Sequence, residues 1–381
     1  MKEGLLNKLP LIASEYEGWP WDVETPASVY DLYNKWPKIT IVTPSFNQGI
    51  YIEETIRSIL LQNYPNLEYI IMDGGSRDNT VEIIRKYSTW ISHWVSETDK
   101  GQSDAINKGF NIANGEIINW INSDDLLEPS ALYYIGKAFI ENKNTDFVCG
   151  KTLAFGKGIN EHVLNPAPII DKMANIYGFP HPQMSSFYRL QRVKEIGAID
   201  NNLRFSMDYD LFVRIFLKGK MMDIQELVAR FRMHPLSKTS TMEKVRLQED
   251  KLIFSRLLNT YRYETPTGIF NSLGFYIAEV QPYTVHTNLS EKELVYSLQM
   301  FLKCRIYSLK ETERGDTFWL VLKTLKASGN KLIFDHHLRA MYRRLLIKRM
   351  SEFPFRIYGQ VFKKRNPKQD VKPKSLDADR N

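Results

Sequence analysis

Cysteine and long hydrophobic runs are both scarce in this chain. Its 381 residues include two cysteines, Cys149 and Cys304, which lie far apart and outside any CxxC pattern. Their number and spacing indicate neither a disulfide framework nor a zinc site, which is typical of a protein of the reducing cytoplasm. No stretch approaches the roughly 20 uninterrupted apolar residues of a transmembrane helix. The N-terminus has acidic residues soon after a short apolar patch and no small-residue cleavage site, so we expect no signal peptide.

Several sequence motifs of nucleotide binding and catalysis are missing as well. The chain has no GxGxxG after its first predicted strand, no GxxxxGK[ST], no HExxH and no GxSxG. These absences argue against a dinucleotide-binding fold, a P-loop nucleotide hydrolase, a zinc protease and a serine hydrolase of the nucleophile-elbow type.

Positive charge is concentrated near the C-terminus. The net charge is +7, but residues 331–374 contain 13 Lys/Arg and 3 Asp/Glu, so the rest of the chain carries −3. The basic balance prompts the alternative of a nucleic-acid-binding protein. Because no pattern of stacking aromatic residues among basic ones accompanies it, we expect no nucleic-acid partner.

Residues 38–151 alternate between strand-like and helix-like patterns. The run 38–44 is rich in β-branched residues, and 51–63 has apolar residues at helical spacing. This alternation predicts an α/β fold of three layers, with a mostly parallel central sheet between two layers of helices. The predicted strands are 38–44, 67–75, 91–97, 116–122 and 146–151, and the predicted helices are 51–63, 78–87, 103–113 and 129–142.

Beyond residue 150 the alternation weakens, although the pattern continues in one domain with longer loops. The segments 182–189 and 224–234 are strand-like, and 207–219 is helix-like with a glycine at its end. We predict four parts: an N-terminal extension laid over the main domain (1–37), the main domain (38–240), a helical C-terminal region (241–335) and a basic amphipathic tail (336–381).

Polar clusters follow four of the predicted strands, at the sheet edge where ligands of parallel sheets bind. The clusters begin at Thr43, Asp73, Glu97 and Asn122. The last one contains two adjacent acids, Asp124 and Asp125, before Pro129. One acid before a proline would serve as a helix cap, but a second, partly buried carboxylate needs a compensating cation. A divalent cation such as Mg²⁺ or Mn²⁺, which takes one or two carboxylates and completes its shell with phosphate oxygens, would compensate it.

Three stretches in this order resemble the inverting glycosyltransferases of family 2, which have the GT-A fold. The resemblance covers about residues 38–235. It implies metal-dependent transfer of a sugar from a nucleotide donor, usually a UDP-sugar, to a hydroxyl group of a glycan or lipid-linked acceptor in cell-surface glycan or polysaccharide synthesis. The stretches are ITIVTPSFNQGIYIEETIRSILLQNYPNLEYIIMDGGSRDNT, ETDKGQSDAINKG and NWINSDDLLEP.

The resemblance also implies the donor-binding residues. Thr43, Pro44 and Phe46 are expected to line the base pocket, and Asp73 to bind the base; for Asp73 the alternative is an Asp-Gly turn. Asp104 is a plausible further donor contact. The full set with donor-binding roles is Thr43, Pro44, Phe46, Asp73, Asp104, Asn122 and Asp124.

The metal ligands implied by the resemblance are Asp124, Asp125 and His234. Asp124, with Asp125, corresponds to the metal and ribose carboxylates of the family's DxD motif. Asn122 stands where the first acid of that motif usually lies, and we expect it to bind a ribose hydroxyl. His234 corresponds to a histidine that closes over the metal and the diphosphate, and imidazole suits Mn²⁺. The alternative for His234 is a purely structural role.

Asp208 is the predicted catalytic base. The segment SMDYDLFVRIF resembles the family's base-carrying segment, with Met207 where the first of two acids usually lies. Inversion is a single displacement and needs one carboxylate to take the acceptor's proton. The alternative is that Asp208 and Asp210 only favour the positive end of the helix they open.

The basic tail suggests where the protein acts. Residues 338–350 place apolar side chains on one helical face and basic ones on its flanks, which is typical of a membrane-surface helix. The alternative is a packed helix with a solvated basic face. We expect a cytoplasmic protein that can attach peripherally to the inner face of the membrane. A nucleotide-sugar-binding pseudoenzyme is the alternative function, because the first acid is missing at both Asn122 and Met207.

Overall fold

The computed structural model describes residues 3–12, 15–166, 176, 181–235, 237–272, 274–284, 289–297 and 301. The chain divides into two compact units, Met1–Cys304 and Arg305–Asn381, and every described residue belongs to the first. The basic tail predicted over 336–381, including the segment 338–350, lies outside the described residues, as does Cys304.

Nine strands of the described residues form one sheet, in the order β3-β2-β1-β4-β8-β6-β9-β5, with β7 paired to β6. The strands β1, β2, β3 and β4 are mutually parallel where they pair. They are β1 (Ile39–Ser45), β2 (Leu67–Asp73), β3 (His93–Ser96), β4 (Ile117–Trp120), β5 (Leu126–Leu127), β6 (Phe147–Phe155), β7 (His162–Leu164), β8 (Ser186–Arg189) and β9 (Met221–Arg232).

The second half of the sheet is mixed. β8 runs antiparallel to both β4 and β6, β9 runs parallel to β6, and β5 runs antiparallel to β9. The predicted parallel arrangement therefore holds for β1 to β4, and the predicted α/β class is confirmed. The start of the segment 182–189 forms a 3-10 turn, η4 (Gln183–Ser185), before β8.

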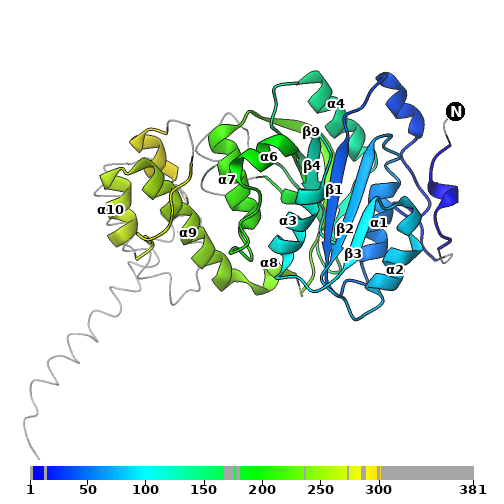
Figure 1. Cartoon of the computed structure of the whole chain (residues 1–381), viewed down its shortest axis with the longest axis horizontal. Helices are drawn as coiled ribbons and strands as arrows, with labels where there is room; N and C mark the ends of the chain where they lie inside the picture. The colour runs from blue at the N-terminus through cyan, green and yellow to red at the C-terminus, as the bar shows by residue number, and fades with distance from the viewer. Residues whose placement is uncertain are drawn as a thin grey trace, which may run out of the picture. The chain divides into compact units, whose positions relative to one another are not determined.

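Helices cover both faces of the sheet. In Figure 1, α1, α2 and α4 lie on one side of the strands, and α3, α6 and α7 lie on the other. The helices are α1 (Ile52–Leu60), α2 (Thr80–Lys86), α3 (Gln102–Ile112), α4 (Ala131–Glu141), α6 (Leu190–Ile196), α7 (Met207–Lys218), α8 (Lys238–Thr241), α9 (Glu243–Tyr261) and α10 (Glu264–Ser272), with 3-10 turns η1 (Leu6–Lys8), η2 (Ala27–Leu32) and η3 (Ser88–Trp90).

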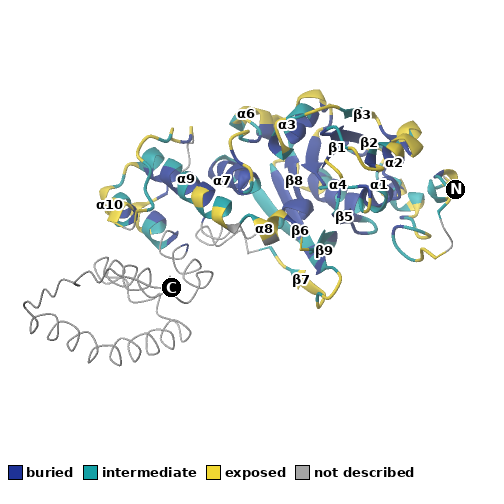
Figure 2. Ribbon diagram, turned by 90° about the horizontal axis from the view of Figure 1, so that it is seen from below, coloured by how far each residue is buried: buried dark blue, intermediate teal, exposed yellow. Residues whose placement is uncertain are grey.

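A hydrophobic core lies between the sheet and the layer of α1 and α4. Alternate residues of β1, Ile39 and Ile41, face this layer and are fully buried together with Ile56 of α1. Each such side chain contributes about 1.5–3 kcal/mol relative to an exposed one. Figure 2 shows most of the sheet in the colour of buried residues. The N-terminal segment adds Tyr30 and Trp36 to the same core.

Arg57 of α1 holds the N-terminal segment in place. Its buried guanidinium donates hydrogen bonds to the backbone oxygens of Pro20 (3.0 Å) and Trp21 (2.8 Å). The Trp19 indole N–H donates to the backbone oxygen of Leu127 in β5 (2.8 Å). Because β5 follows the Asp124–Asp125 pair directly, the N-terminal segment supports the loop that carries these acids.

Candidate active site

The carboxyl ends of β1, β2 and β4 lie side by side, because these strands are adjacent and parallel. Ser45, the last residue of β1, is in register with Asp73, the last residue of β2. Asn122 follows β4 by two residues. The structure therefore brings three of the predicted polar clusters to the sheet edge at which α/β proteins bind ligands.

The residues expected to line the base pocket differ in exposure. Thr43 is fully buried, and its hydroxyl accepts a hydrogen bond from Tyr69 (3.2 Å). Pro44 is also buried, whereas the Phe46 ring is 59% exposed. The Ser45 hydroxyl is buried without a hydrogen-bond partner. Of the expected residues, Phe46 is therefore the one whose side chain is open to a ligand, and Ser45 has unused hydrogen-bonding capacity.

Asp73 organises the loop that follows β2. Its Oδ2 accepts hydrogen bonds from the N–H groups of Gly75 (3.1 Å) and Ser76 (2.9 Å) and from the Ser96 hydroxyl (2.6 Å). Its Oδ1 accepts one from the Ser76 hydroxyl (2.5 Å). Asp73 is thus the acceptor of the Asp-Gly turn, and Oδ1, with a single donor, keeps capacity for a second one.

Asp124 and His234 meet across the site. The His234 Nε2 lies 3.0 Å from the Asp124 Oδ2, and the two side chains are 13% and 21% exposed. The Arg232 guanidinium donates to the backbone oxygen of Asp124 (2.9 Å) and stacks over the Tyr51 ring. The end of β9 therefore holds the loop after β4 by side-chain contacts, and both Asp124 and His234 remain accessible.

Asp125 has different surroundings. It is 1% exposed, and its oxygens accept hydrogen bonds from the Asn122 amide (3.0 Å) and the Arg232 N–H (3.0 Å). Burial, and secondarily the charge of Asp124, raises the pKa of Asp125 well above its usual value. Asp125 thus fixes the conformation of the loop from its buried side, whereas Asp124 faces the site.

Neither acid caps a helix. The helix predicted to begin at Pro129 begins at Ala131, its N-terminus has no side-chain cap, and β5 separates it from the two acids. The capping explanation of the acid pair is therefore wrong.

The side chains at this edge suit a divalent cation that takes ligands from a substrate. Among the described residues, no group of three or more His, Cys, Asp and Glu side chains could hold a metal alone. Asp124 and His234 supply one carboxylate and one imidazole. Mg²⁺ and Mn²⁺ bind through one or two carboxylates with phosphate oxygens and water in the other positions. The pair fits such an ion, with the phosphates of a bound nucleotide completing its shell.

Asp208 lies in the first turn of α7 and is partly buried. Its Oδ1 accepts a hydrogen bond from the Tyr209 N–H (2.8 Å). Burial raises the pKa of Asp208 to about 6, although that hydrogen bond and the charge of Lys238 oppose the rise. A carboxylate with a pKa near the working pH is suited to general-base catalysis.

The N-terminus of α7 is fixed by α9. The Glu249 carboxylate accepts hydrogen bonds from the consecutive N–H groups of Arg204 (2.7 Å), Phe205 (2.8 Å) and Ser206 (2.7 Å). These groups precede the helix and would otherwise lack partners within it. The helical C-terminal region therefore positions the first turn of α7, where Asp208 lies two residues after Ser206.

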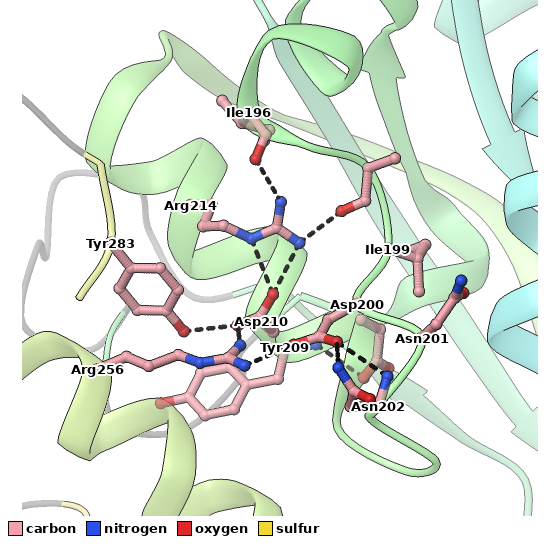
Figure 3. Close-up of polar contacts among 12 residues, drawn as sticks. Ile196, Ile199, Asp200, Asn201, Asn202, Tyr209, Asp210, Arg214, Arg256 and Tyr283 are labelled. Atoms are coloured by element: carbon pink, nitrogen blue, oxygen red, sulfur yellow. Dashed lines mark hydrogen bonds and ion pairs between the residues drawn. The ribbon is translucent and has the colours of Figure 1, made fainter. Parts of the chain in front are cut away.

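Asp210 has a structural role that its sequence position does not reveal. It is 1% exposed and accepts hydrogen bonds from Arg214 Nε (2.8 Å), Arg256 Nη1 (2.8 Å) and the Tyr283 hydroxyl (2.6 Å). Figure 3 shows both guanidinium groups and the tyrosine converging on this carboxylate. Asp200 binds the other end of Arg256. Asp210 thus joins α7 to α9, and its partners are side chains rather than the helix dipole.

Residues 40–202 match the model of glycosyl transferase family 2. This region of the chain is a family 2 glycosyltransferase domain. The chain is 26% identical to an uncharacterised glycosyltransferase of Rickettsia typhi over 299 residues, which cover 72% of this chain and 92% of the relative.

Two solved structures share the GT-A fold of this glycosyltransferase. Staphylococcus aureus TarS 1–349 in complex with UDP-GlcNAc superposes with a TM-score of 0.51 at 17% identity, covering 76% of this chain and 81% of the other. The mannosyltransferase PcManGT from Pyrobaculum calidifontis, in complex with GDP-Man and Mn²⁺, gives 0.51 at 13% identity, covering 89% and 86%. These likenesses confirm the predicted fold.

Other residues near the glycosyltransferase site include Asp104, which the sequence singled out, and two that it did not. Asp104 pairs with Lys108 (3.5 Å) and accepts the Lys100 N–H (3.1 Å), so its carboxylate is engaged within its own helix and the preceding loop. Gln102 and Lys238, which the sequence analysis did not single out, contact each other close to Asn122. No local pattern marks them, because they are far apart along the chain.

Proposed function

We propose that this glycosyltransferase moves a sugar from a nucleoside diphosphate donor, a UDP-sugar, to a hydroxyl group of a glycan or lipid-linked acceptor, with inversion at the anomeric carbon. The observation that carries the proposal is the contact between Asp124 and His234 at the carboxyl ends of the parallel strands. The pair suits a metal-bound diphosphate, and related folds bind UDP-GlcNAc in TarS and GDP-Man with Mn²⁺ in PcManGT.

Each residue of the site would have its own role in the reaction. Asp124 and His234 would hold Mg²⁺ or Mn²⁺, which when bound supplies positive charge to the departing diphosphate. Phe46 would contact the base, and the remaining capacity of Asp73 Oδ1 would accept a hydrogen bond from it. The acceptor oxygen bonds to the anomeric carbon as the bond from that carbon to the diphosphate breaks. Asp208 takes the acceptor's proton, and its pKa of about 6 leaves it ionised at neutral pH.

The place in the cell where the protein acts is also part of the proposal. No helix among the described residues is long and apolar enough to cross a membrane. We propose that the protein acts in cell-surface glycan or polysaccharide synthesis and attaches to anionic lipid through the basic segment 338–350. A membrane-bound acceptor would make such attachment useful.

The proposed function is tested by incubating the full chain and Mn²⁺ with a panel of UDP-sugars, and with GDP-Man, and measuring released nucleoside diphosphate. Release from a UDP-sugar supports the proposal, and NMR of a product formed with a simple sugar acceptor reads the anomeric configuration. Release from GDP-Man alone would contradict the donor assignment. Binding of nucleotide-sugars by thermal shift without any release would favour the pseudoenzyme, for which the missing acids at Asn122 and Met207 are the motivation.

A further inference from the structure

Lys238 begins α8, four residues after the candidate metal ligand His234. Its ammonium group donates hydrogen bonds to Gln102 Oε1 and to the backbone oxygen of Arg204 (3.0 Å). Both acceptors are neutral. Among the contacts of the described residues, Lys238 forms no ion pair, whereas the preceding cations Arg230 and Arg232 pair with Glu128 and Glu54.

The position of Lys238 is set by a chain of amide groups. The Gln102 Nε2 donates to Asn122 Oδ1 (2.7 Å), and the Asn122 Nδ2 donates to Asp125 Oδ2 (3.0 Å). Asp125 in turn accepts the Arg232 N–H (3.0 Å). Through Gln102, Lys238 is therefore tied to the loop that carries Asp124. Its ammonium group is held at the site by one neutral side chain and one backbone oxygen, without an ion pair.

The negative charges around Lys238 come from both parts of the proposed reaction centre, the catalytic base and the metal ligand. Lys238 is exposed, and the negative charges of Asp208, Glu249 and Asp124 favour its charged form. Asp208 is the proposed base and Asp124 the proposed metal ligand. A cation that interacts with both carboxylates would stabilise the negative charge that develops on a departing diphosphate.

We propose that Lys238 is a diphosphate-binding residue of the donor site, which exchanges its contact with Gln102 for a phosphate oxygen of the nucleotide. This inference rests on the proposed function and adds a source of positive charge that does not depend on a metal. The exposed part of the site then combines one metal-binding carboxylate, Asp124, with one lysine. The neutral Asn122 fits this arrangement, because a carboxylate there would compete with phosphate for positive charge.

The test is titration calorimetry of UDP, and separately of uridine, into the full chain in Mn²⁺ and in EDTA. Lys238→Met should weaken UDP binding at least about tenfold in both conditions, which corresponds to one charge-assisted hydrogen bond. Uridine, which lacks phosphate, should bind both proteins alike. Lys238→Arg keeps the charge and should bind UDP more tightly than Lys238→Met. Lys194→Met, an exposed lysine of α6, is the control and should match the parent.

The outcomes separate the two proposals. If the parent binds neither UDP nor GDP in Mn²⁺, the proposed function and this inference both fail. If the parent binds UDP and folded Lys238→Met binds it equally well in both conditions, the inference alone is overturned. Equal weakening of uridine and UDP would also overturn it, because the lysine would then support the pocket rather than bind phosphate.

Discussion

Replacing Asp208 with Asn should change turnover and stability in opposite directions. Asn is close to Asp in shape but cannot take a proton from the acceptor. Loss of a general base typically lowers the rate by about 10²–10⁴-fold. The loss should appear in kcat, with UDP binding nearly unchanged, because the proton moves only as the new bond forms.

The effect on stability follows from the environment of Asp208. Burial raises its pKa from 3.8 to about 6, so the folded protein holds this proton more tightly than the unfolded chain. The resulting stabilisation is complete below the unfolded pKa and is lost as the pH rises through about 6. A shift of about two pKa units corresponds to at most about 3 kcal/mol, and partial exposure lowers the expected effect to about 1–2 kcal/mol. Because Asn cannot ionise, Asp208→Asn should be more stable than the parent at pH 8.

The measurements are steady-state transfer at saturating donor and urea unfolding at pH 4 and pH 8. The gain in unfolding free energy should be present at pH 8 and close to zero at pH 4. Asp22→Asn, an exposed acid of the N-terminal segment, is the control. Asp210→Asn is unsuitable, because Asp210 is bound by two arginines. Removing a base usually lowers the rate by more than about tenfold. An Asp208→Asn variant that keeps more than about a tenth of the parent rate would therefore refute the assignment of Asp208.

Three further changes test other parts of the account. Asp210→Asn removes the charge shared by one buried and one partly buried guanidinium group, and it should lower the free energy of unfolding by about 3–5 kcal/mol. A loss below about 1 kcal/mol in urea would contradict this. Asn122→Asp restores the family's usual acid but replaces a hydrogen-bond donor with a carboxylate that faces Asp125. It should therefore lower the free energy of unfolding by about 1–3 kcal/mol and weaken UDP binding. Tighter UDP binding would show that the amide contact is unimportant. Deleting residues 336–381 should leave donor hydrolysis intact and reduce sedimentation with anionic vesicles; undiminished sedimentation would exclude the tail as the anchor.

The elements of the fold could be predicted where local periodicity encodes them. The alternating patterns of 38–142 correspond to β1 to β4 and α1 to α4, because each element has its own buried face. The strand β5 and the strand β7 were not predicted, since two or three residues are too few to show a period. The mixed pairing of β8 and β9 depends on which strands meet in space, and residue spacing does not record that.

The candidate site could be predicted at the level of strand ends but not of individual contacts. The adjacent acids Asp124 and Asp125 look equivalent in the sequence, yet only Asp124 faces the site. The difference comes from Arg232, which lies more than 100 residues away and donates its N–H to Asp125. Gln102 and Lys238, which also contact each other, are even further apart in the sequence. Such pairs are set by the folded topology, and no local rule reports them.

The central claim is that the carboxyl ends of the parallel strands bind a donor diphosphate through Asp124. Titration of UDP in Mn²⁺ into the parent and into Asp124→Asn tests this claim most directly. We expect the parent to bind UDP, Asp22→Asn to match it, and Asp124→Asn to bind at least about tenfold more weakly, since it loses the carboxylate that would hold the metal. In EDTA the difference between the parent and Asp124→Asn should largely disappear. Equal affinities of the parent and Asp124→Asn in Mn²⁺ would contradict the claim.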